Sequence, residues 1–115
     1  MGGTAEDQQL DALFTALSDR TRRDIVARLS TGEATVKELA EPYAMSMQAV
    51  SQHIRVLERS GLISQGRERQ TRPCRLEPAA LDSVLSWIEE SRRTWSNRMD
   101  RLETQLARLQ ERENQ

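Results

Sequence analysis

The sequence has few of the residues on which catalytic sites depend. Its 115 residues include one cysteine, Cys74, and one histidine, His53. A single cysteine excludes an internal disulfide framework. Neither residue has a second histidine or cysteine nearby in the sequence, and no Gly-rich phosphate loop or nucleophile–base arrangement stands out. We therefore expect a protein that is not an enzyme and that uses no cofactor.

Aromatic residues and long apolar runs are also scarce. Aromatics make up 3% of the chain, so the core is expected to consist mostly of Leu, Ile, Val and Ala, as in helical proteins. No apolar run approaches the length that spans a bilayer and nothing resembles a signal peptide, which predicts a cytoplasmic protein with no membrane partner. A chain of this length predicts one domain, whose small core a second subunit would help to stabilise.

Positive charge is concentrated in the middle of the chain. The whole chain carries a net charge of −1 and has a pI of about 5.9, which taken alone argues against a nucleic-acid binder. Residues 46–75, however, contain six arginines and two glutamates, and both flanking segments are net negative. Such a local excess is expected of a surface that contacts phosphate groups.

Apolar periodicity predicts three helices in the first 42 residues. The first has one apolar face at helical spacing, made of Leu10, Leu13, Phe14 and Leu17. Ser18 or Asp19 is expected to cap a second helix, which ends at Gly32 and keeps its arginines in solvent. Thr35 is expected to cap a third, short helix that stops at Pro42.

A fourth helix is predicted between the N-cap Ser46 and Gly61, and it has two different faces. The apolar side chains Val50, Ile54 and Leu57 form one stripe. Opposite them lie four residues suited to hydrogen bonding, Gln48, Ser51, Gln52 and Arg55. Base edges in the major groove present donors and acceptors, so this polar face predicts contact with DNA. An ordinary solvated face is the alternative.

A basic hairpin is predicted to follow that helix. Its two short strands cover residues 62–66 and 72–76, and Pro73 is expected at an edge because it cannot donate to a ladder. Arg67, Arg69 and Arg72 are placed to contact phosphates or the minor groove. Two short helices, a tight turn and a basic hairpin form a winged helix-turn-helix pattern.

Three stretches of the sequence resemble the ArsR/SmtB family of dimeric winged helix-turn-helix repressors. They read LSDRTRRDIVARL, ATVKELAEPYAMSMQAVSQHIRVLERSGLI and RPCRLEP. The resemblance implies a mainly α fold with a small β-hairpin wing and a long C-terminal helix. It also implies that Met47 reads bases together with Gln48, Ser51 and Gln52. His53, Arg55 and the wing arginines are expected to contact the DNA backbone.

The sequence departs from the family pattern in two places and lacks its metal ligands. Arg20 stands where a proline usually follows the aspartate, and Arg69 stands at the usual wing-tip glycine. Metal-sensing members carry Cys-x-Cys ligands on the third helix, or Asp, His and Glu ligands on the last helices. The third helix here lacks cysteine and histidine and the last lacks histidine, so no metal site is expected.

Cys74 has two possible roles. Arg72 and Arg75 stand close to it in the sequence and would lower the pKa of its thiol, which would favour a redox-sensitive group. The alternative is an inert thiol packed on a strand.

The C-terminal third carries an apolar heptad seam. Pro78 is expected at the first position of a last helix. The seam of this helix has alternating spacings of four and three residues and consists of Leu81, Leu85, Ile88, Arg92, Trp95, Met99, Leu102, Leu106 and Leu109. A helix over residues 78–112 would be about 52 Å long, too long for so small a domain to cover. We expect it to pair with a second copy, in parallel or antiparallel orientation. Leu10, Leu13 and Leu17 are expected to add to this dimer interface.

The predicted organisation has three parts. Residues 1–7 form a disordered N-terminus, residues 8–77 a winged helix-turn-helix DNA-binding domain, and residues 78–115 a C-terminal dimerisation helix. The predicted function is that of a homodimeric transcriptional regulator that binds double-stranded DNA sequence-specifically, and the resemblance suggests an autoregulatory repressor at an inverted-repeat operator. The alternative is a helical dimeric adaptor that binds a protein through its basic face. The sequence identifies no inducer.

Overall fold

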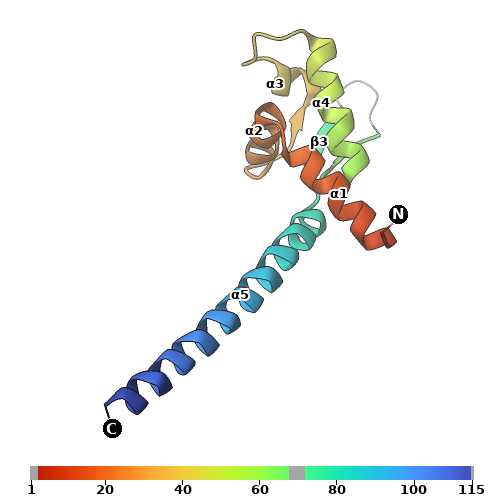
Figure 1. The fold of residues 1–115 in the computed structure, drawn as a ribbon. Coiled ribbons are helices and arrows are strands. Elements are labelled where there is room, and N and C mark those ends of the chain that lie inside the picture. Colours follow the sequence, from red (N-terminus) through yellow and green to blue (C-terminus); the bar gives the residue numbers. More distant parts are fainter. Residues whose placement is uncertain (1–2, 68–71, 115) are drawn as a thin grey trace. The chain divides into compact units, whose positions relative to one another are not determined.

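The computed structural model describes residues 3–67 and 72–114 and confirms a mainly helical fold with a small antiparallel sheet (Figure 1). Along the chain the elements are α1 (Ala5–Leu17), α2 (Arg20–Leu29), β1 (Ala34–Thr35), α3 (Val36–Ala40), α4 (Met47–Ser60), β2 (Ile63–Gln65), β3 (Pro73–Leu76) and α5 (Pro78–Glu113). None of the helices in the described ranges has a stretch long and apolar enough to cross a membrane.

The chain divides into two compact units, and the boundary lies inside α5. The first unit ends at Val84 and the second begins at Leu85. The boundary differs from the predicted one after residue 77, because Ala80 and Val84 of α5 are buried in the core of the first unit. The first turns of α5 therefore belong to the winged helix-turn-helix unit.

Local hydrogen bonds at the helix starts explain where the first three helices begin. Thr4 and Asp7 form a capping box, so α1 starts at Ala5 and the prediction of disorder up to Asp7 is wrong for its last three residues. Asp19 caps α2, which begins at Arg20 without the usual proline. Thr35 caps α3 through a second capping box.

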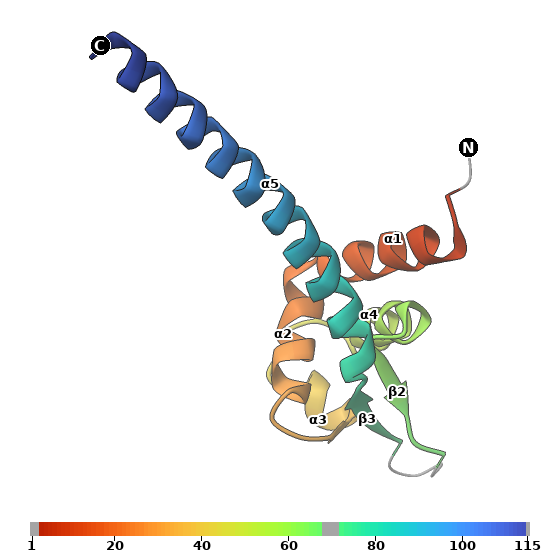
Figure 2. The same cartoon turned by 90° about the horizontal axis from the view of Figure 1, so that it is seen from below.

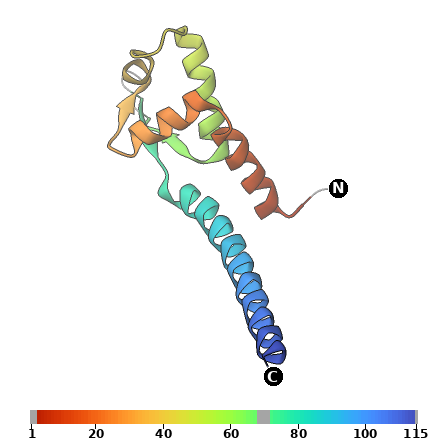
Figure 3. The ribbon, with the colours of Figure 1, turned by 60° about the vertical axis from the view of Figure 1, so that its left-hand side comes forward.

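The core of the first unit is aliphatic, as predicted. Helices α1 and α4 pack together in it, and Figure 3 shows α1 in red against the yellow-green α4. Leu13 is wholly buried in this core and has no exposed surface to offer a partner, so its predicted place in a dimer interface is wrong. Leu10, Leu17 and Leu81 are half-buried against the core.

The wing sheet contains a strand that the sequence did not predict. β1 is two residues long and pairs with β3, while β2 pairs with the other side of β3 (Figure 2). Pro73 therefore lies in the central strand, and its predicted edge position is wrong. It is the first residue of β3, where a missing N–H is tolerated, and its carbonyl accepts from the N–H of Gly66 at 2.9 Å.

Two arginines of α2 bond to the ends of neighbouring helices, which the sequence did not predict. Arg28 donates to the carbonyl oxygens of Leu39 and Glu38 at the end of α3, at 2.8 and 2.9 Å. Arg23 donates to the carbonyl oxygen of Leu17 at 2.8 Å. The last turn of a helix leaves carbonyls without intrahelical partners and carries partial negative charge, so these guanidinium groups stabilise the ends of neighbouring helices.

The second unit consists of the rest of α5 and exposes its apolar seam. Trp95 and Leu106 are 59% and 56% exposed. The other large apolar residues of the seam in this unit are also exposed: Leu85, Ile88, Met99, Leu102 and Leu109.

Candidate nucleic-acid interface

Helix α4 is fixed at both ends by the residues that the sequence predicted. The hydroxyl of Ser46 accepts from the N–H of Ala49 at 3.1 Å and caps the N-terminus. Gly61 has a φ of 89° at the C-terminus, in the left-handed region that favours glycine. Helix α4 therefore spans the same residues for which the sequence predicts one apolar and one polar face.

The two faces of α4 separate as predicted. Val50, Ile54 and Leu57 are buried in the core of the first unit. The opposite face carries a surface hollow of about 330 Å³. It is lined by the four residues predicted for that face, Gln48, Ser51, Gln52 and Arg55, and by Met47, which the family resemblance had added. Within this hollow the guanidinium of Arg55 donates to the side-chain oxygen of Gln52 at 3.3 Å. The structure thus brings together amide, hydroxyl and guanidinium groups on one accessible surface.

The wing presents two of its three predicted arginines in the described part of the chain. Arg67 and Arg72 are exposed, and Arg72 has a φ of 27°. The prediction for Arg69 lies outside the described residues. Arg75 is also exposed but forms an ion pair with Glu33, with nitrogen–oxygen distances of 2.6 and 2.8 Å. Of the described wing arginines, Arg67 and Arg72 are therefore the best placed for a phosphate contact.

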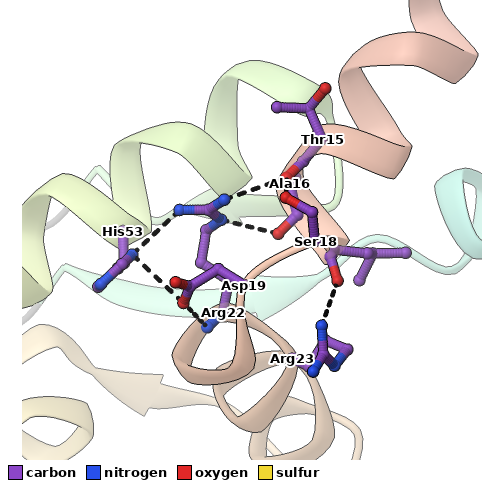
Figure 4. Close-up of polar contacts among 8 residues, drawn as sticks. Thr15, Ala16, Ser18, Asp19, Arg22, Arg23 and His53 are labelled. Atoms are coloured by element: carbon purple, nitrogen blue, oxygen red, sulfur yellow. Dashed lines mark hydrogen bonds and ion pairs between the residues drawn. The ribbon is translucent and has the colours of Figure 1, made fainter.

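His53, which is predicted to contact the DNA backbone, faces α2 with one side of its ring. Its Nδ1 is 3.2 Å from Nη1 of Arg22 and 3.8 Å from a carboxylate oxygen of Asp19 (Figure 4). The side chain is 22% exposed. This side of the ring contacts α2 instead of facing solvent. No local pattern predicts this contact, because Arg22 and His53 are 31 positions apart.

The carboxylate of Asp19 is stabilised by the groups around it. The N–H of Arg22 donates to it at 3.1 Å, and this hydrogen bond is the main reason that the pKa of Asp19 lies below its usual value. The positive charge of Arg22 acts in the same direction. A charged carboxylate at the N-terminus of α2 also interacts favourably with the helix dipole.

Comparison with known proteins shows which regulators this chain is similar to. A model described as a helix-turn-helix domain matches residues 17–65. The HTH-type transcriptional regulator Rv2034 of Mycobacterium tuberculosis is 37% identical over 79 residues, which cover 69% of this chain and 74% of the relative. The transcriptional repressor SdpR of Bacillus subtilis is 30% identical over 79 residues, covering 69% and 88%.

A solved structure extends the match to the fold. The crystal structure of an ArsR family transcriptional regulator superposes with a TM-score of 0.73 at 40% identity, covering 76% of this chain and 97% of that one. The chain belongs to the ArsR family. An ArsR-like transcriptional regulator from Rhodococcus sp. RHA1 gives a TM-score of 0.72 at 26% identity, covering 83% and 90%. The predicted winged helix-turn-helix fold and the predicted class, a DNA-binding transcriptional regulator, are confirmed.

The single thiol of this ArsR family member is packed inside the wing. Cys74 is wholly buried on β3, and burial raises the pKa of its thiol to about 11, with the charge of Glu58 adding to the effect. The expectation that neighbouring arginines lower this pKa is wrong, because burial outweighs them and Arg75 is paired with Glu33. The inert, packed thiol of the sequence analysis is the alternative that the structure supports.

Zinc, cadmium and arsenite are each expected to leave DNA binding by this ArsR family member unchanged. Helix α3 has neither cysteine nor histidine and α5 has no histidine, so the usual ligands are missing. In the described parts of the chain, no three His, Cys, Asp or Glu side chains are grouped so that they could hold a metal ion. Fluorescence anisotropy of a labelled duplex checks this during metal titration. Stoichiometric metal binding that releases the duplex would overturn the prediction.

Proposed function

We propose that the protein is a homodimeric repressor that binds an inverted-repeat operator and occludes the promoter of its own gene. One α4 enters the major groove at each half-site, and the wings contact the flanking backbone. The observation that carries this proposal is the hollow on α4, because its lining consists of the five side chains Met47, Gln48, Ser51, Gln52 and Arg55. In this proposal the protein has no catalytic role and needs no cofactor.

The chemistry of the hollow fits base edges better than it fits a protein surface. The amides of Gln48 and Gln52 can donate and accept at once, as the edge of adenine requires in the major groove. Arg55 can bond to guanine or to a phosphate, and its contact with Gln52 orients both side chains. Met47 is 50% exposed and can pack against a thymine methyl group.

Two observations support a repressor that acts as a dimer. SdpR, which shares 30% identity with this chain, is a transcriptional repressor by name. The exposed seam of α5 offers apolar surface at heptad spacing, and such a seam is stable in water only against a matching surface. A second copy supplies that surface and places two copies of α4 on one DNA duplex.

The salt dependence of DNA binding tests the proposal against the adaptor alternative. The probe is a duplex that the full chain selects from a random-sequence library. Affinity is expected to fall steeply as salt rises, because bound phosphates release counterions, and the preference for the selected duplex should survive excess competitor DNA. Salt-independent binding, or no preference over random DNA, would favour a protein partner for the basic face.

Replacing the wing arginines is expected to weaken binding to every DNA sequence alike. Arg67→Ala and Arg72→Ala remove phosphate contacts, which position the protein without reading sequence. Each change should therefore lower affinity for selected and random duplexes equally and flatten the slope of log affinity against log salt by about 1. Arg69→Ala is expected to act in the same way.

Arg75→Ala is the matched control for the wing, because the Arg75 guanidinium is held by Glu33. It should change the salt slope less than the other variants do. If Arg67→Ala and Arg72→Ala left the slope at its wild-type value, the wing would not contact the backbone.

A further inference from the structure

The side chain of Arg22 joins three segments of the first unit. Its Nε donates to the carbonyl oxygen of Ala16 at 2.7 Å, and its Nη2 donates to that of Thr15 at 3.0 Å (Figure 4). Both carbonyls belong to the last turn of α1. The remaining nitrogen, Nη1, lies 3.2 Å from Nδ1 of His53 on α4. Arg22 lies on α2, and all three nitrogens of its guanidinium therefore contact other helices: two contact α1 and one contacts α4.

The direction of the contact with His53 follows from the chemistry of the two groups. Arginine has no acceptor, so Nδ1 of His53 must accept the hydrogen bond. The ring proton then lies on Nε2. Asp19 completes the arrangement on the same side, since its carboxylate receives the N–H of Arg22 and lies 3.8 Å from Nδ1.

We propose that Arg22 is a positioning residue for DNA recognition, which sets the rotation of α4 through His53. His53 directly follows Gln52 on α4, and a helix turns by about 100° per residue. Holding one side of His53 against α1 and α2 therefore sets the direction in which Ser51 and Gln52 point. This inference rests on the proposed reading of bases by α4.

Apolar packing alone does not set this rotation as closely. Val50, Ile54 and Leu57 hold α4 against the core, but hydrophobic contact is non-directional and tolerates small rotations. Hydrogen bonds are directional, and those of a planar guanidinium to three acceptors are especially so. A bidentate contact between glutamine and adenine in turn tolerates little misalignment.

The first test compares two charge-conserving variants. Arg22→Lys keeps the positive charge but has one nitrogen in place of the three planar nitrogens that reach Ala16, Thr15 and His53. It is expected to lower the ratio of affinities for selected and random duplexes about tenfold, while affinity for random DNA stays constant. Arg23→Lys is the control, because Arg23 caps the same end of α1 through Leu17 and its hydrogen bond does not involve α4. It should leave the ratio unchanged.

The second test asks which ring nitrogen of His53 matters. In His53→Asn the side-chain oxygen can take the place of Nδ1 and accept from Arg22, whereas His53→Gln places its amide nearer the position of Nε2. The Asn variant is expected to retain the wild-type ratio and the Gln variant to lose about tenfold. All ratios are measured at a temperature where circular dichroism shows each variant to be folded, so a loss of stability is not mistaken for a loss of preference.

Each outcome decides the proposal. If His53→Gln kept the ratio and His53→Asn lost it, the ring would act outward through Nε2, as a contact to a base, and Arg22 would not position α4. Equal effects of Arg22→Lys and Arg23→Lys would reduce Arg22 to a cap of α1 and overturn the proposal as well. The wild-type protein provides the separate check, because a chain with no preference for its selected duplex would contradict base reading by α4 itself.

Discussion

Cutting the chain after Trp95 is expected to break the dimer and to lower affinity for the operator by about two orders of magnitude. The cut removes the outer part of the α5 seam: Met99, Leu102, Leu106 and Leu109, each 39–56% exposed in the single chain. Such side chains stabilise a helix pair by burial against a partner. Two half-sites held by one dimer benefit from a high effective concentration, which separate chains lose.

Sedimentation velocity and operator titration check this prediction on the same samples. A chain ending at Arg112 is the control, because it lacks only residues beyond the seam and should remain dimeric. Circular dichroism shows whether the first unit of the shortened chain stays folded. An undiminished dimer after the cut at Trp95 would place the interface elsewhere. Leu10, Leu17 and Leu81, which are half-buried against the core, would then be the next residues to replace.

Replacing Gln48 or Gln52 by alanine is expected to cost about 1–3 kcal/mol on the selected duplex, a loss of roughly 5–150-fold in affinity. Both side chains line the hollow on α4 and are exposed, so truncation should leave the fold intact. Affinity for random DNA should change far less, because phosphate contacts supply most of it. The measurement is the ratio of the two affinities at one salt concentration.

Gln9→Ala is the matched control for these variants. Gln9 is an exposed glutamine of α1, so its removal deletes the same chemical group away from α4. It should leave the ratio at its wild-type value. Equal losses on selected and random DNA for the Gln48 and Gln52 variants would show that α4 contacts DNA without reading it.

Features governed by neighbouring residues could be predicted from the sequence. Thr35, Ser46 and Gly61 act within one helix turn of themselves, and the structure has them where capping chemistry predicts. The two faces of α4 follow from helical spacing alone. Four of the five residues that line the hollow follow from this spacing, whereas Met47 was expected only from the family resemblance.

Features that depend on distant contacts could not be predicted. β1 has two residues, too few to show alternation, and it exists because β3 pairs with it. That pairing also makes Pro73 a central residue. Leu13 has the spacing of a surface seam, but α1 packs it wholly into the core. The contact between Arg22 and His53 joins α2 to α4, and no local pattern marks either residue as a partner of the other.

Methylation interference on the selected duplex tests the central claim most directly. Dimethyl sulfate modifies guanine N7, which lies in the major groove, where α4 is proposed to enter. The account predicts two clusters of interfering guanines related by a two-fold axis and separated by about 10 base pairs or a multiple of that spacing. Clusters that weaken in Arg55→Ala would tie the readout of guanine to α4. Binding that persists on fully methylated DNA, or a single cluster without symmetry, would contradict the account.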